Sequence, residues 1–188
     1  ADRAYTPEPD PEDESIRDRW QLSEPYIFYL GGFDVRKNIK TAISAFAKVS
    51  TAVASATFVI AGRIPDGRNS LFVNPRRQVA KAGIVQGRVK FLGFVEEETK
   101  PALYRGARMF LFPSAYEGFG LPPMEAISCG VPVVGSERAS LPEVVGRAGI
   151  LLSPDDVDGM AGAMIQLLID DPMVAELRQE AHKQAARF

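Results

Sequence analysis

Short apolar runs alternate with amphipathic segments over most of the chain. Residues 26–30 are apolar at every position, as expected for a strand that is buried on both faces of a parallel sheet. Comparable runs predict five further strands, at 57–61, 89–94, 108–113, 131–135 and 149–152.

Between the strands, apolar residues recur three and four positions apart, which is the spacing of one face of a helix. The clearest case is 39–49, and we expect further helices at 74–82, 97–105, 124–129, 141–145, 157–168 and 173–188. This alternation predicts an α/β fold, a Rossmann-like doubly wound parallel six-stranded sheet with helices on both faces. Ligands of such sheets bind beyond the carboxyl ends of the strands.

The first 24 residues differ from the rest of the chain. The stretch 7–14 reads Pro-Glu-Pro-Asp-Pro-Glu-Asp-Glu, which is acidic, rich in proline and without apolar side chains. Such a composition cannot fill a core. We therefore expect a linker or surface arm at 1–24 with a short helix near 15–22, a folded domain at 25–172, and a truncated last helix at 173–188.

Composition narrows the class of protein. A chain of 188 residues with 46% hydrophobic content can form one domain with a core. The net charge of −2 gives no indication of a nucleic-acid partner, and the single cysteine excludes an internal disulfide and a cysteine metal cluster. Because the chain shows neither a signal peptide nor an apolar run of about 18 residues, we expect a cytoplasmic protein without a membrane span. Peripheral membrane contact by a longer parent protein stays open.

The segment Glu117–Glu125 carries the strongest chemical signal, and it reads Glu-Gly-Phe-Gly-Leu-Pro-Pro-Met-Glu. A predicted strand precedes it and a helix follows it, and proline is favoured in the first turn of a helix. A glycine loop at the start of a helix can point backbone N–H groups at a phosphate. Carboxylates accept hydrogen bonds from hydroxyl groups. The segment therefore favours a ligand with both hydroxyl groups and phosphates, such as a nucleotide-sugar.

Two further glycine turns follow predicted strands, at Gly31-Gly32 and at Gly62-Arg63. Together with Glu117-Gly118, they are expected along one rim of the sheet. A nicotinamide-dependent oxidoreductase on the same architecture is a weaker alternative. The chain lacks a complete Gly-x-Gly-x-x-Gly fingerprint there, and Arg63 stands where that class has an acidic residue.

Five stretches resemble the C-terminal, donor-binding half of retaining glycosyltransferases with the two-domain GT-B fold. More closely, they resemble the glycosyl transferases group 1 family (family 4). The stretches are 29–38, which reads Tyr-Leu-Gly-Gly-Phe-Asp-Val-Arg-Lys-Asn, and 59–62, 89–93, 114–130 and 140–149. The resemblance covers about residues 25–172 and implies a nucleotide-sugar-binding domain that is the second half of a GT-B fold.

The resemblance also implies residue roles. Glu117, Arg36 and Lys37 would be catalytic, with Glu117 beside the donor sugar and the two cations neutralising the departing diphosphate. Glu125 would hold the ribose diol. Further contacts with the donor are implied for Gly32, Phe94, Val95, Gly118, Phe119, Gly120 and Leu121. Many members of the family have an arginine at the position of Gly32, so here Arg36 is expected to supply that charge.

The family usually needs no metal ion or cofactor, because cationic side chains and a helix N-terminus stabilise the phosphates. The chain has no Asp-x-Asp motif in a suitable loop, which agrees with the absence of a metal site. The resemblance thus implies the donor domain of a metal-independent, retaining hexosyltransferase in carbohydrate biosynthesis. The Arg-Lys-Asn form slightly favours mannose on GDP over UDP-linked donors.

The sugar or glycolipid acceptor would bind a preceding domain that this sequence does not contain. We therefore expect the chain alone to bind a donor without efficient transfer. A non-catalytic nucleotide-sugar-binding module is the alternative from a different functional class.

Overall fold

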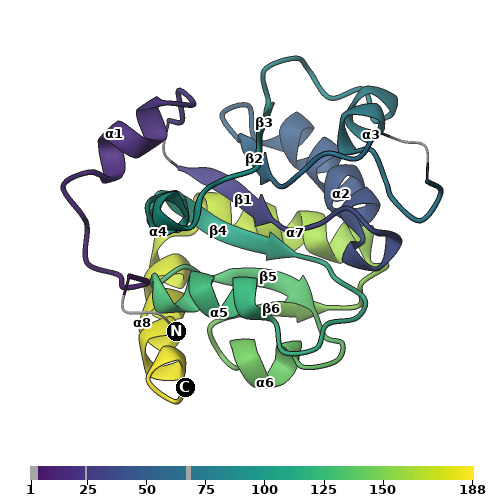
Figure 1. The fold of residues 1–188 in the computed structure, drawn as a ribbon. Helices are drawn as coiled ribbons and strands as arrows, with labels where there is room; N and C mark the ends of the chain where they lie inside the picture. Colours follow the sequence, from purple (N-terminus) through teal and green to yellow (C-terminus); the bar gives the residue numbers. More distant parts are fainter. Residues whose placement is uncertain (1–3, 24, 67–68) are drawn as a thin grey trace.

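A computed structural model describes residues 4–23, 25–66 and 69–188 (Figure 1). All of the predicted strands form one parallel sheet with the order β3-β2-β1-β4-β5-β6. The strands are β1 (Tyr26–Leu30), β2 (Phe58–Ala61), β3 (Val89–Gly93), β4 (Ala107–Phe112), β5 (Val133–Ser136) and β6 (Gly149–Leu152). The prediction of a Rossmann-like doubly wound sheet is therefore confirmed.

Helices connect the strands and cover both faces of the sheet (Figure 1). They are α1 (Asp13–Asp18), α2 (Ile39–Ala52), α3 (Pro75–Lys81), α4 (Lys100–Arg105), α5 (Leu121–Ser128), α6 (Leu141–Val145), α7 (Val157–Ile169) and α8 (Asp171–Ala185), with 3-10 turns η1 (Val35–Lys37) and η2 (Glu97–Thr99). Helix α5 starts at Leu121 instead of Met124 because Pro122 and Pro123 form its first turn, where the missing N–H groups have no intrahelical partner.

Side chains of each strand alternate between two cores. In β1, Phe28 and Leu30 pack in the core that includes α4 and α5, whereas Ile27 and Tyr29 pack in the core that includes α2 and α7. Both faces of the central strands are thus buried, which explains why these strands are apolar at consecutive positions.

The acidic segment before β1 packs onto the domain. Helix α1 starts at Asp13, earlier than predicted, and lies against α4. Asp13 is only 5% exposed, and its two carboxylate oxygens accept hydrogen bonds from Arg105 at 2.7 and 2.6 Å. Ile16 and Leu22 are buried as well. One paired carboxylate and the apolar residues that follow therefore attach the segment, while residues 1–3 and 24 of the predicted arm lie outside the described residues.

The strand order changes direction between β1 and β4. Strands β2 and β3 extend the sheet on one side of β1, and β4, β5 and β6 extend it on the other. In sheets of this kind ligands bind at the carboxyl ends of the two strands that flank the change. Among the described residues, no helix combines the length and the apolar character needed to cross a bilayer.

Candidate functional site

An ion pair between Lys37 and Glu117 lies at this switch point. The Lys37 Nζ atom is 2.7 Å from Glu117 Oε1, and the two side chains are 23% and 11% exposed. Lys37 Nζ also lies 5.6 Å from the centre of the Phe112 ring, in a cation–π contact. The turns after β1 and β4 thus bring together two of the three residues predicted to be catalytic.

Backbone hydrogen bonds hold the two turns against each other. The Ala115 N–H donates to the Arg36 carbonyl at 2.8 Å. The hydroxyl of Ser114, which is 1% exposed, lies 3.2 Å from the same carbonyl oxygen and 3.2 Å from that of Tyr116. The segment that carries Glu117 is therefore fixed to η1, one residue away from Lys37.

Asn38 is a second fixing residue, to which the sequence analysis gave no role beyond the Arg-Lys-Asn form. It adopts a left-handed conformation (φ 54°) between η1 and α2, which asparagine tolerates better than most residues. Its Nδ2 group donates to the carbonyls of Pro113 and Pro154 at 3.3 and 2.6 Å, and its Oδ1 accepts from the Thr41 hydroxyl at 2.9 Å. Asn38 therefore joins the turns after β4 and β6 to the residue that follows Lys37.

Arg36 points to a different partner. Its Nε donates to Asp34 Oδ1 at 2.9 Å, and its side chain is 66% exposed. The hydrogen bond and charge of Asp34 raise the pKa of Arg36. The structure therefore places Arg36 on the rim of the site, whereas Lys37 lies inside it.

The loop 118–121 presents its backbone to the same region. Gly120 has a φ of 91°, a backbone conformation that favours glycine, and a Cβ atom there would crowd Leu141 Cδ2 at 3.2 Å. In the part of the chain that the structure describes, the N–H groups of 118–121 donate to no acceptor. Pro122 and Pro123 have no N–H, so the amide donors at this end of α5 come from the loop.

Glu125 lies one helical turn into α5 and lines a neighbouring cavity. Its Oε2 accepts a hydrogen bond from the Tyr104 hydroxyl at 2.8 Å. Burial raises the pKa of Glu125, although this hydrogen bond and the charge of Lys100 act in the opposite direction. The cavity measures about 320 Å³ and is lined by Tyr5, Glu97, Phe119, Leu121, Met124, Glu125 and Phe188.

The two residues predicted to lie near a base face different surroundings. Phe94 is 61% exposed, and the Arg63 guanidinium carbon lies 5.5 Å from its ring centre. Val95 is buried and packs in the core that includes α4. A ligand can therefore reach the Phe94 ring, whereas the Val95 side chain packs in the core and is not open to a ligand.

The glycines after β1 and β2 have different constraints. Gly62 has a φ of +142°, and a Cβ atom there would lie 2.1 Å from the Gly31 carbonyl oxygen, so this position needs glycine. A Cβ atom at Gly32 would meet only Asp34 Oδ2, at 3.7 Å. The carbonyl of Gly32 accepts a hydrogen bond from the buried Tyr29 hydroxyl at 2.6 Å. Packing within the chain therefore does not require glycine at position 32.

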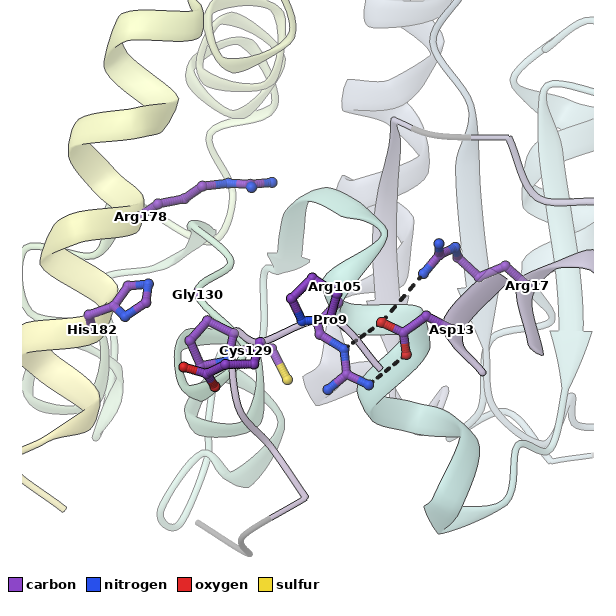
Figure 2. A pocket seen from close by; sticks show the side chains of 10 residues that line it. Pro9, Asp13, Arg17, Arg105, Cys129, Gly130, Arg178 and His182 are labelled. Atoms are coloured by element: carbon purple, nitrogen blue, oxygen red, sulfur yellow. Dashed lines mark hydrogen bonds and ion pairs between the residues drawn. The ribbon is translucent and has the colours of Figure 1, made fainter. Parts of the chain in front are cut away.

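A larger cavity, of about 550 Å³, lies at the opposite end of α5 (Figure 2). Its lining includes Cys129 and Gly130, which follow α5 and lead into β5, so it lies toward the amino ends of the strands. Figure 2 shows Asp13 paired with Arg105 and Arg17 on one side of this cavity, opposite Arg178 and His182 of α8. We place the candidate site at the carboxyl ends instead, where sheets of this type bind ligands. Neither region of the described chain contains a group of three or more His, Cys, Asp or Glu side chains suited to a metal ion.

Comparison with known proteins shows the family of the chain. Residues 12–187 match the family model described as glycosyl transferases group 1. The O-antigen chain mannosyltransferase B of Escherichia coli is 39% identical over 168 residues, which cover 89% of this chain and 43% of the relative. The chain therefore spans less than half the length of this curated relative.

Solved structures share the fold. The C-terminal domain of LpcC, a glycosyl transferase group 1 family protein from Francisella tularensis, superposes with a TM-score of 0.84 at 20% identity over 98% of this chain and 95% of that domain. Anabaena HepE in complex with UDP and glucose superposes with a TM-score of 0.83 at 24% identity, over 98% of this chain and 49% of HepE.

Proposed function

The chain belongs to the glycosyl transferases group 1 family, and from this membership we propose that it is the donor-binding domain of a retaining hexosyltransferase. The donor is a nucleoside diphosphate sugar, and mannose carried on GDP is the first candidate because the E. coli relative is a mannosyltransferase. The observation that carries the proposal is the Lys37–Glu117 pair at the switch point, beside the amide groups of 118–121.

In this proposal the diphosphate binds between Lys37 and the loop 118–121. The loop offers N–H donors that have no acceptor within the described chain, and Lys37 offers a charge at the same place. Arg36 lies at the rim with a long exposed side chain, so it can turn from Asp34 to an outer phosphate oxygen. Each charge-assisted contact contributes about 1.5–3 kcal/mol.

Glu117 then faces the sugar. As the bond to the diphosphate breaks, positive charge develops at the reacting carbon, and a fixed carboxylate nearby stabilises it. In the unliganded site Lys37 pairs with Glu117. As the diphosphate departs, Lys37 pairs with its phosphate oxygens instead. The acceptor hydroxyl attacks the reacting carbon on the face from which the diphosphate leaves and passes its proton to the departing phosphate oxygen, which gives retention of configuration.

The nucleoside extends toward Glu125 and Phe94. The Glu125 carboxylate accepts hydrogen bonds from the ribose hydroxyls, and the exposed Phe94 ring with Arg63 beside it offers a stacking surface for the base. The cations Arg36 and Lys37 do the work of a divalent ion, so we propose that transfer needs no metal. We further propose that the protein acts in the cytoplasm, with a sugar or glycolipid acceptor held by a preceding domain.

Calorimetric titration of the chain with GDP, UDP, ADP and NAD⁺ tests the proposal. We expect one nucleoside diphosphate to bind, with at least about tenfold loss of affinity in Glu125→Ala, which removes a charge-assisted contact. The matched control is Glu143→Ala, which removes an exposed helical glutamate from α6 and leaves the affinity unchanged. Binding of NAD⁺ alone, or of none of the four, contradicts the proposal.

A transfer assay on a protein that also carries the preceding domain tests the catalytic part. We expect hexosyl transfer that persists in excess EDTA and that falls at least about tenfold when Arg36 and Lys37 are both replaced by alanine. Donor binding without any transfer would instead identify a non-catalytic nucleotide-sugar-binding domain.

A further inference from the structure

Tyr104 is a fully buried tyrosine whose hydroxyl contacts a residue of the proposed donor site. It lies on α4, is 0% exposed, and donates a hydrogen bond to Glu125 Oε2 at 2.8 Å. Its ring packs edge-on against the rings of Phe28 and Phe110, with centroids 5.3 Å away in both cases. The ring is therefore held on several sides, and the direction of its hydroxyl is fixed.

A purely structural role would not require tyrosine at this position. The surroundings of the ring are aromatic and apolar, so a phenylalanine would fill the same space without a polar group that needs a partner. The partner that the hydroxyl has is a carboxylate lining a cavity, and not a backbone carbonyl. Tyr26 shows the contrast, because its buried hydroxyl donates to the Leu103 carbonyl at 2.6 Å.

The contact fixes one oxygen of Glu125 and leaves capacity for a ligand. An ionised carboxylate offers about four acceptor positions, and Tyr104 takes one of them. The Tyr5 hydroxyl also acts on this carboxylate, and Glu125 lines a cavity of about 320 Å³ together with Phe119 and Leu121 of the loop 118–121. A carboxylate that is held by one oxygen can present fixed acceptor directions to two neighbouring hydroxyl groups.

We propose that Tyr104 is a positioning residue that orients Glu125 to accept hydrogen bonds from both ribose hydroxyls. Tyr104 then determines the preference of the site for ribonucleoside over 2′-deoxyribonucleoside diphosphates. This inference rests on the proposed function, since it concerns the nucleoside part of the same donor site.

The electrostatic surroundings agree with this role. Burial raises the pKa of Glu125, the negative charge of Glu97 on η2 raises it further, and the positive charge of Lys100 on α4 lowers it. The hydroxyls of Tyr104 and of Tyr5, from the segment before α1, also lower it. Burial raises the pKa of Tyr104 well above its ordinary value, so its hydroxyl remains a donor throughout the pH range of an experiment.

The experiment compares each of GDP, UDP and ADP with its 2′-deoxy form, six nucleotides in all, by calorimetry on the chain. The wild type is expected to prefer the ribonucleotide of the pair that it binds by at least about tenfold, the loss of one charge-assisted hydrogen bond. Tyr104→Phe reduces this preference below about threefold and moves the pH midpoint of nucleotide binding upward, because a hydrogen bond that lowers the pKa of Glu125 is gone. Tyr26→Phe, the matched control, leaves preference and midpoint unchanged.

A double-mutant cycle with Glu125→Gln tests whether Tyr104 acts through Glu125. If it does, Tyr104→Phe adds no further loss of preference in the Glu125→Gln background. An unchanged preference in Tyr104→Phe, in a wild type that does discriminate, overturns this inference and leaves the proposed function standing. A wild type that binds ribonucleotide and deoxyribonucleotide equally overturns the ribose role of Glu125 and this inference with it. A wild type that binds none of the six overturns the proposed function as well.

Discussion

Replacing Lys37 by methionine keeps most of the side-chain volume and removes the charge that faces Glu117. The Glu117 side chain, which is 11% exposed, then loses the ammonium group that lies 2.7 Å away. A carboxylate buried to this degree cannot recover its hydration, so the free energy of unfolding should fall. Glu117→Gln, the reciprocal change, leaves Lys37 without its counter-charge.

The expected magnitude follows from the distance and the burial. At 2.7 Å and an effective dielectric constant of about 20, the Coulomb attraction of a unit pair is about 6 kcal/mol. Desolvation of the two groups offsets more than half of that, so the net coupling should be about 1.5–3 kcal/mol. Each single substitution should cost about 2–3 kcal/mol, and the double substitution should cost less than the two together.

Urea unfolding of the wild type, both single variants and the double variant measures this coupling. In parallel, the affinity of Lys37→Met for its nucleoside diphosphate should fall about 10–100-fold, because a charge-assisted contact is lost. A coupling below about 0.5 kcal/mol, which is within the scatter for independent sites, would refute the argument that the two side chains form one fixed unit.

Three further predictions concern Gly62, Asp13 and Glu125. Gly62→Ala should lower the free energy of unfolding, measured by urea unfolding, by about 2–4 kcal/mol. The reason is that its Cβ would clash with a backbone carbonyl at 2.1 Å and that the φ of Gly62 is +142°. In the control, Gly118→Ala, the new Cβ has open space and should change the free energy of unfolding by less than about 0.5 kcal/mol. Burial raises the pKa of Asp13, but hydrogen bonds from Arg105 and from the Asp10 N–H, with the charges of Arg105 and Arg17, outweigh it and leave the pKa below its ordinary 3.8. The difference in unfolding free energy between wild type and Asp13→Asn should therefore be about 3 kcal/mol above pH 5 and shrink as the pH falls through the folded pKa. A constant difference between about pH 3 and 7 would rule this out. Burial raises the pKa of Glu125 above its ordinary 4.5, so the charged form of this carboxyl lowers the stability of the fold. Glu125→Gln should therefore raise the melting temperature at pH 7, and this gain should disappear below about pH 4.5. A variant that melts at a lower temperature than the wild type at pH 7 would contradict the burial of a charged Glu125.

The strands of the sheet were predictable because burial on both faces is visible in the residues of each strand. A strand buried on both faces must be apolar at consecutive positions, and β1 at Tyr26–Leu30 is apolar throughout. Boundaries were less predictable where local and tertiary effects compete. Helix α1 was misplaced because the packing of Asp13 against Arg105, 92 residues away, decides where it starts.

The site likewise has parts that were predictable from the sequence and parts that were not. The Glu117 segment was visible as a strand, a glycine loop and a proline-led helix, but its contact with Lys37 depends on the pairing of β1 with β4. The orientation of Arg36 had a local signal that was missed, since Asp34 caps η1 and binds the guanidinium two residues on. Tyr104 could not be found from its surroundings in the sequence, because its role depends on how α4 packs against α5.

Amide chemical shifts of the isotope-labelled chain, recorded by NMR during titration with GDP and with UDP, test the central claim most directly. The account predicts that the nucleotide that binds causes its largest shifts in the amides of 118–121 and in the residues that flank Lys37, with smaller shifts near Glu125. Shifts that gather instead around the cavity of Arg105 and His182 (Figure 2), at the other end of α5, would contradict it.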